Sequence, residues 1–111
     1  MTTLIRRSPY NSRTVSEALR MSLGLTLKGN KVTVVFVEDG VYLLMANSDG
    51  AINNPDMMKH IEALKAFDCR LIAEYESLKR RGISVPISEV SVETQTAVNQ
   101  TLQESDRVIV I

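Results

Sequence analysis

The sequence predicts an α/β protein: a single domain over residues 1–111, built as three layers with a mainly parallel sheet of about five strands. Strand and helix signals alternate along the chain, an order typical of parallel strands joined by right-handed crossovers. Residues 31–37 are β-branched and nearly all apolar, without polar alternation. This pattern indicates a strand buried on both faces. Residues 108–111 (Val-Ile-Val-Ile) are also strong β-formers, so we expect them inside the sheet.

The first strand and helix are predicted from the opening of the chain. Residues 4–6 form a short strand candidate, and a turn follows. Thr14 and Glu17 have the spacing of a capping box, which places a helix start at Thr14. Apolar residues then recur at helical spacing until Gly29 ends the helix.

The middle of the chain predicts a second helix. Asp39 is expected to cap a helical turn over residues 41–45. Asn54 and Pro55 suit the cap and the first position of a helix. The residues expected to form its buried face, at helical spacing, are Met57, Ile61, Leu64 and Phe67.

The last third of the chain contains two further strand signals. Residues 69–73 and 89–91 are strand candidates, and residues 77–81 between them predict one or two helical turns that stop at Gly82. A helix follows over residues 94–104. Its expected buried residues are Ala97, Val98, Thr101 and Leu102.

Ligands of parallel sheets bind outside the carboxyl ends of the strands, where this chain places acidic and aromatic residues. The candidate pocket for a ligand or partner consists of Tyr10, Glu38, Asp39, Gly40, Glu74 and Tyr75. One interpretation is a polar pocket for a cationic group, a metal or a basic partner segment. The other is that Asp39 and Glu76 merely begin helices, where the dipole favours negative charge.

The single thiol, Cys69, is the one candidate catalytic residue. A nucleophilic cysteine needs neighbouring cations or a helix N-terminus to lower its pKa. Cys69 lies at the predicted start of a strand, at the end of the sheet opposite the crevice. The adjacent Arg70 points to the other face of that strand. A packed thiol is therefore favoured over a reactive one.

Other kinds of site have little support. With one histidine and one cysteine at no ligand-like spacing, we expect neither a metal nor a cofactor. His60 is interpreted as a boundary residue, partly packed and partly solvated. No glycine loop for phosphate follows a strand. A phosphate cradle at the start of the first helix stays open as an alternative, built from Ser8, Asn11, Ser12 and Thr14.

The composition of the chain limits the kinds of partner and the cellular compartment that we expect. Thirteen basic and thirteen acidic residues cancel, which gives no broad electrostatic reason to bind nucleic acid or a membrane. A single cysteine forms no internal disulfide, and the N-terminus lacks an apolar signal core. We therefore expect a cytoplasmic protein.

Several blocks, in their order and spacing, resemble the DsrE/DsrF/TusBCD family of small sulfur-relay proteins. They are Pro9-Tyr10, Glu17-Ala18-Leu19-Arg20, the run from Val34 to Val41, and the segment from Arg70 to Gly82. The Asp-Gly-Val turn at residues 39–41 is most like the DsrF/TusC type. The resemblance implies a small α/β/α domain that assembles into trimers or hexamers, of one subunit or of related ones. It also implies a role in passing persulfide sulfur between proteins, for tRNA thiolation or sulfur oxidation.

In active subunits of that family, a sulfur-carrying cysteine lies eight residues before the glycine of a basic-basic-Gly turn. That position here is Glu74, and a carboxylate cannot hold a persulfide. The leading hypothesis is thus a non-catalytic subunit that acts in oligomeric assembly or partner binding, with a sulfur-carrier protein as one candidate partner. Two alternatives stay open: a persulfide carrier that uses Cys69, and a small-ligand pocket at the strand ends.

Overall fold

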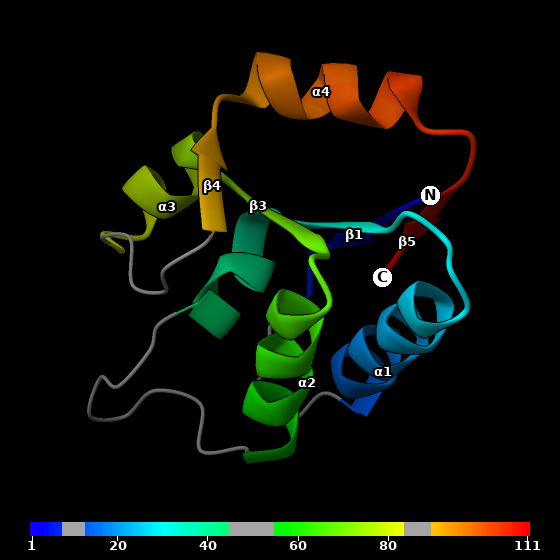
Figure 1. Ribbon diagram of the computed structural model, residues 1–111. Helices are drawn as coiled ribbons and strands as arrows, with labels where there is room; N and C mark the ends of the chain where they lie inside the picture. Colours follow the sequence, from blue (N-terminus) through cyan, green and yellow to red (C-terminus); the bar gives the residue numbers. More distant parts are fainter. Residues whose placement is uncertain (8–12, 45–54, 84–89) are drawn as a thin grey trace.

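The computed structural model (Figure 1) describes residues 1–7, 13–44, 55–83 and 90–111. Strands and helices alternate as the sequence predicts. In chain order they are β1 (Thr2–Ile5), α1 (Arg13–Leu27), β2 (Thr33–Phe36), the 3₁₀ helix η1 (Glu38–Leu44), α2 (Pro55–Ala66), β3 (Arg70–Glu74), α3 (Tyr75–Arg80), β4 (Val90–Glu93), α4 (Gln95–Glu104) and β5 (Val108–Val110).

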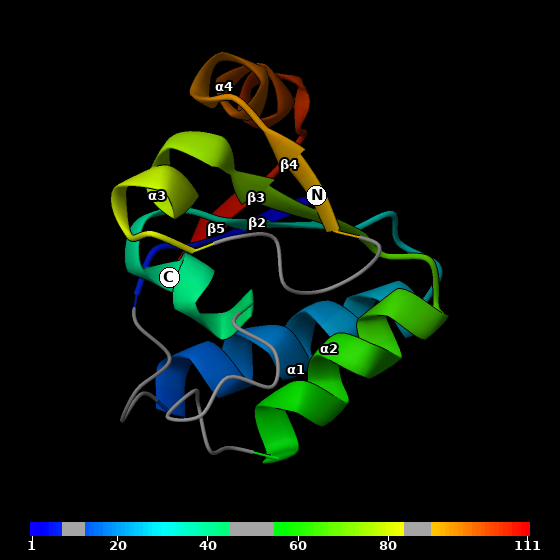
Figure 2. The same cartoon turned by 90° about the vertical axis from the view of Figure 1, so that its left-hand side faces the viewer.

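The five strands form one parallel sheet in the order β4-β3-β2-β1-β5. Helices α1 and α2 cover one face, and α4 crosses the opposite face (Figures 1 and 2). The predicted three-layer α/β/α fold is therefore confirmed. Because all strands run in the same direction, their carboxyl ends meet at one edge, where a ligand site is expected.

The core explains why the run at residues 31–37 lacks alternation. Val34 and Phe36 point into the larger apolar cluster between the sheet and helices α1 and α2. Val35 and Val37 belong to a smaller cluster on the α4 side. Since successive strand residues point to opposite faces, a strand with helices on both sides has apolar residues at every position.

The prediction that the last strand lies inside the sheet is wrong. Among the described strands, β5 is an edge strand that pairs with β1 alone, and Val108 and Val110 are 38% and 55% exposed. Val110 lies opposite Leu4, which packs in the α4-side cluster, so the two valines stand on that face. Hydrophobic β-formers indicate a strand, but they do not fix its place in the strand order.

Helix α4 covers its face of the sheet less fully than predicted. Of the four residues expected to be buried, only Val98 is, at 2% exposure. The half-buried others are Ala97, Thr101 and Leu102. The prediction of which side of α4 faces the sheet is correct. Those residues stay in contact with solvent because the apolar cluster on this side of the sheet is small.

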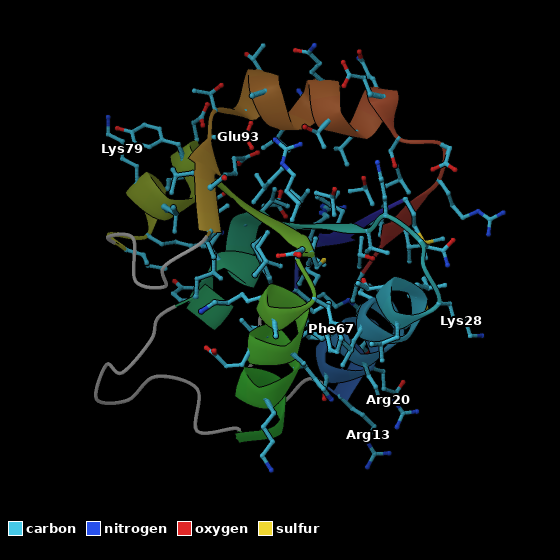
Figure 3. All side chains as sticks on the ribbon, viewed as in Figure 1. Arg13, Arg20, Lys28, Phe67, Lys79 and Glu93 are labelled. Carbon is cyan, nitrogen blue, oxygen red and sulfur yellow. The ribbon has the colours of Figure 1, made fainter. Side chains whose placement is uncertain are left out.

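Helix α2 is confirmed except at its end. Ile61 and Leu64 are fully buried as predicted, and the prediction for Met57 falls outside the described side chains. Phe67, in contrast, is 54% exposed (Figure 3). The helix stops at Ala66, so Phe67 lies beyond it, in the turn that leads through Asp68, with φ of 60°, toward β3.

The predicted capping box is also misplaced. Helix α1 already includes Arg13, so Thr14 occupies an exposed helical position in the first turn instead of the cap. Helix boundaries read from local spacing are uncertain by a residue or two, because a hydroxyl suits several positions near a helix start. No described helix is long and apolar enough to cross a membrane.

Candidate functional site

A pocket of about 280 Å³ lies at the carboxyl ends of β1, β2 and β3, between the sheet and α4. Its apolar residues are Leu4, Val37, Val98 and Leu102. Its polar residues are Arg6, Glu38, Glu74, Arg80, Gln95 and Asn99. Two carboxylates, two guanidinium groups and two amides thus surround a partly apolar space, an arrangement suited to a small polar ligand or a partner side chain.

The structure brings some of the predicted pocket residues together and separates others. Glu38 and Glu74, from the ends of neighbouring strands, both line this pocket. Asp39 lines an adjacent hollow instead, together with Arg6 and Arg7. Tyr75 is 48% exposed and lines neither.

Neither of the two remaining candidates, Gly40 and Tyr10, contributes a described side chain to the strand-end pocket. Gly40 packs directly against the backbone of Ile5, where a Cβ atom would overlap the Ile5 carbonyl oxygen. Gly40 therefore allows the backbone of η1 to pack closely against the end of β1, beside the pocket. Tyr10 lies outside the described residues.

A hydrogen-bonded chain joins the carboxylate of Glu74 to the backbone of Glu38. The hydroxyl of Ser77, fully buried, donates to Oε1 of Glu74 at 2.6 Å and accepts the backbone N–H of Glu38 at 2.8 Å. Glu38 has φ of 51°, a left-handed conformation that ordinary residues seldom adopt. Ser77 therefore supports a strained turn and positions Glu74 at the same time.

Replacing Ser77 with alanine is expected to lower the free energy of unfolding by about 1–3 kcal/mol, because the partly buried N–H of Glu38 loses its acceptor. Equilibrium urea unfolding measures the loss. Glu74→Gln is the matched control: its amide oxygen still accepts from Ser77, so its stability should stay near wild type. A Ser77→Ala protein as stable as wild type would show that the network contributes nothing.

Two ion pairs flank the network. Nε of Arg6 lies 3.3 Å from Oε2 of Glu38, and both side chains are about half exposed. Arg81 holds Asp39 through two nitrogens, at 3.1 and 2.9 Å, and its guanidinium lies 6.0 Å from the centre of the Tyr42 ring. Pairs this exposed contribute little to stability. They place guanidinium groups beside the carboxylates at this end of the strands.

The alternative interpretation of Asp39 and Glu76 as helix-starting residues is confirmed in position, since each lies in the first turn of a helix, and both carboxylates also have specific partners. Asp39 lies within η1, and its carboxylate binds Arg81. Glu76 lies in the first turn of α3, but both its oxygens accept the N–H of Gln95 at 3.0 Å. Gln95 begins α4, so Glu76 serves the start of the following helix. Sequence spacing cannot reveal such a cap, since its two partners are distant in the chain.

Cys69 is a packed thiol at the amino-terminal end of β3, the end of the strands opposite the pocket. It lies just before β3 and is 9% exposed, and its Sγ donates to the carbonyl oxygen of Val32 at 3.1 Å. Burial raises the pKa of the Cys69 thiol above the 9.0 of a free thiol, although a hydrogen bond with Thr26 opposes the shift. A raised pKa disfavours the thiolate that nucleophilic sulfur chemistry requires.

The raised pKa of Cys69 predicts a loss of stability in alkali. Below pH 9 the thiol is protonated in both states; above it the unfolded thiol ionises first, which favours unfolding. Stability should therefore fall as pH rises through 9 until the folded thiol also ionises. Urea unfolding between pH 8 and 10.5 should show a steeper decline for wild type than for Cys69→Ala. Parallel curves would contradict the assignment.

Among the described residues, no three His, Cys, Asp or Glu side chains gather closely enough to hold a metal. The open alternative of a phosphate cradle mostly falls outside the described residues, at Ser8, Asn11 and Ser12. Its remaining member, Thr14, is an exposed residue of α1.

Sequence reasoning missed several residues of the strand-end pocket. Arg6 directly follows β1, so the rule that placed Glu38 and Glu74 here could have found it. Arg80, Gln95 and Asn99 carry no such signal, because they reach the pocket only through the packing of α3 and α4.

Comparisons with known proteins agree with this architecture. The crystal structure of the ychN protein from E. coli superposes with a TM-score of 0.84 at 18% identity, covering 99% of this chain and 97% of that one. A conserved protein of unknown function from Bacteroides thetaiotaomicron, BT1422, gives a TM-score of 0.74 at 14% identity, covering 99% and 94%. A search of curated proteins gave no significant match. A model of the DsrE/DsrF-like family matches residues 1–111, and the chain belongs to this family.

Proposed function

We propose that this protein is a non-catalytic DsrE/DsrF-like subunit, of the DsrF/TusC type, that acts in oligomeric assembly or partner binding in sulfur relay. The observation that carries the proposal is Glu74. It occupies the position where the family resemblance expects the sulfur-carrying cysteine, and its carboxylate is bound to Ser77. The chain's only thiol, Cys69, is buried at the opposite end of the strands from Glu74.

The edge strand β5 supports a role in assembly. Val108 and Val110 present apolar surface beside an unpaired strand edge, a combination that favours association with another chain. The proposed assembly is a trimer or hexamer of this chain or of related family subunits, and a sulfur-carrier protein is a proposed partner. We place it in the cytoplasm, where a lone thiol stays reduced.

The intact mass of the protein after exposure to a persulfide donor tests the non-catalytic assignment. Wild type and Cys69→Ser should both keep their mass. The double variant Glu74→Cys with Cys69→Ser, which restores a thiol at the family position, is the positive control and should gain one sulfur atom. A gain on wild type that Cys69→Ser abolishes would make Cys69 a carrier and overturn the proposal.

Native mass spectrometry across a range of protein concentrations tests assembly. A stable oligomer is expected, and Val110→Lys should weaken it because a charge would enter the apolar edge. Gln103→Lys, an exposed change on α4, is the matched control and should leave the oligomer intact. A wild-type chain that stays monomeric at high concentration, alone and mixed with related subunits, would contradict the assembly role.

The strand-end pocket favours a second candidate function, the binding of a small ligand with a cationic group. Glu38 and Glu74 converge there, and only one Glu74 oxygen has a hydrogen-bond partner among the described residues. Spermidine is a suitable probe: it should raise the melting temperature of wild type, and Glu74→Gln should reduce that rise. Equal stabilisation of both proteins would remove this candidate.

A further inference from the structure

The two edges of the sheet differ in the side chains that they present on the α4 face. Strand β4 forms one edge, and Ser91 and Glu93 share a face with the buried Ile72 of the neighbouring strand. Glu93 also binds Arg70 of that strand at 3.0 Å. Polar and charged residues of this kind discourage an edge strand from pairing with another chain. Strand β4 is thus a protected edge.

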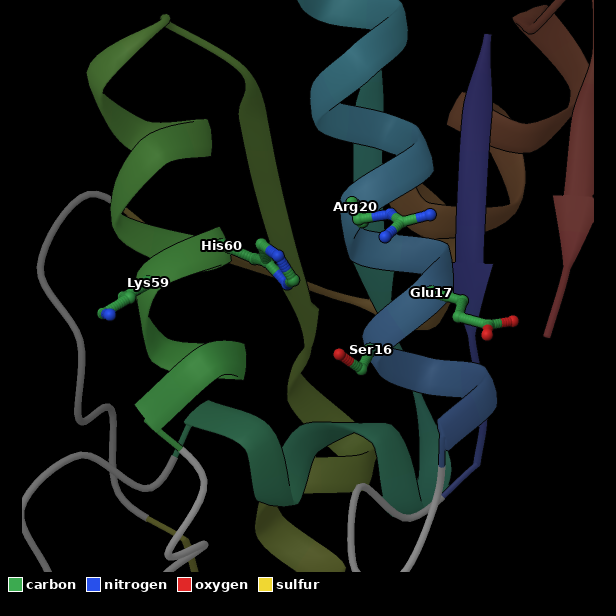
Figure 4. Close-up of a pocket in the computed structure, with 5 residues that line it drawn as sticks. All are labelled: Ser16, Glu17, Arg20, Lys59 and His60. Carbon is green, nitrogen blue, oxygen red and sulfur yellow. The ribbon is translucent and has the colours of Figure 1, made fainter.

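Strand β5, at the other edge, has no such protection. On the same face it presents Val108 and Val110, which are 38% and 55% exposed, and it contains no charged residue or proline. In Figure 4, β5 lies beyond β1, on the side away from α2. No residue of β5 lines the pocket between α1 and α2 shown there, where His60 is half-buried, as predicted for a boundary residue. Among the described strands, β5 is therefore the edge open to another chain.

The hydrogen bonds of β5 show which of its backbone groups point outward. Arg107 and Ile111 bond through their backbones to β1 and to the residue that follows it. In a parallel pair, alternate residues turn both backbone groups to the same neighbour, so Ile109 also faces β1. The N–H and C=O groups of Val108 and Val110 therefore point away from β1, and they have no hydrogen-bond partner among the described residues.

We propose that β5 pairs antiparallel with β5 of a second copy of this chain, across a two-fold axis at Ile109, and so joins two sheets into one. The inference rests on the proposed role in assembly and specifies its interface. Val108 lies opposite the partner's Val110, and each such pair exchanges both of its N–H···O bonds. The valines that are exposed in a single chain then form apolar cross-strand pairs.

The positions of the outward groups favour a second copy in this register. Val108 and Val110 lie symmetrically about Ile109, whereas an axis at either valine would leave the other opposite a residue outside β5. Arg107 lies opposite the partner's Ile111, so the two guanidinium groups stand at opposite ends of the seam and do not repel. A two-fold interface requires an even number of subunits, so the hexamer is expected instead of the trimer.

Cysteine cross-linking in a Cys69→Ser background tests the register. At the axis, Ile109 faces the partner's Ile109 as a pair without mutual hydrogen bonds, with Cα atoms about 4.5 Å apart. That distance suits a disulfide, so Ile109→Cys treated with diamide should run as a covalent dimer on a non-reducing gel. Val110→Cys is the matched control, since it is more exposed on the same strand but lies roughly 8–9 Å from its own copy. It should stay monomeric on the gel.

A second pair of variants leaves the half-buried Ile109 untouched. Val108→Cys and Val110→Cys, oxidised together after subunit exchange, should form a mixed dimer, because these two positions lie about 5.5 Å apart across the seam. Neither variant should cross-link alone, because each lies too far from its own copy.

Native mass spectrometry of the unoxidised proteins separates this inference from the assembly role itself. Even-numbered oligomers, together with the two expected cross-links, support the β5 pairing. An oligomer in which Val110→Cys cross-links alone as readily as Ile109→Cys, or in which neither expected cross-link forms, would overturn the pairing and leave assembly standing. A monomeric wild type without cross-links would overturn both.

Discussion

Gly40→Ala is expected to lower the free energy of unfolding by about 3 kcal/mol, as the insertion of an atom into fully packed surroundings does. The added Cβ would overlap the carbonyl oxygen of Ile5 and lie 2.9 Å from its carbonyl carbon. That carbonyl cannot easily move, because it accepts the N–H of Val37 at 3.0 Å. The substitution must therefore push η1 away from the end of β1, beside the strand-end pocket. Equilibrium urea unfolding measures the loss.

Gly24→Ala is the matched control for this change. Gly24 lies inside helix α1, and a Cβ built there meets no atom within 4 Å. Alanine is favoured over glycine in a helix by about 1 kcal/mol, so this variant should be slightly more stable than wild type. Equal stability of the Gly40 and Gly24 variants would show that the contact between Gly40 and Ile5 is not the constraint described above.

Much of the fold was predictable because the hydrophobic patterns are local. Strands β2 and β3 and helices α2 and α4 lie within a residue or two of their predicted bounds. Strand order was not predictable: it depends on which strand each crossover returns to, and no residue encodes that choice locally. The exposed valines of β5 show the difference, since their sequence indicates a strand but not an edge.

The candidate site was predictable only where a strand end defines it. Glu38 and Glu74 follow or end neighbouring strands, and they line one pocket. Asp39, one residue from Glu38, turns toward Arg81, because successive residues of a tight turn point in different directions. Ser77 links the two glutamates through its hydroxyl, yet it was predicted only as part of a helical turn. A local pattern contains no information about such a distant contact.

Phe36→Ala is expected to destabilise the protein by about 3–5 kcal/mol, the range for removing a buried aromatic side chain. Phe36 is fully buried at the end of β2, the central strand of the sheet, so its removal leaves a cavity among residues that cannot all collapse into it. Phe67→Ala makes the same chemical change at a site that is 54% exposed, and should cost less than about 1 kcal/mol. Urea unfolding of both variants gives the two values. Similar losses would mean that Phe67 is buried, in this chain or against another copy, and would contradict the exposed position described for it.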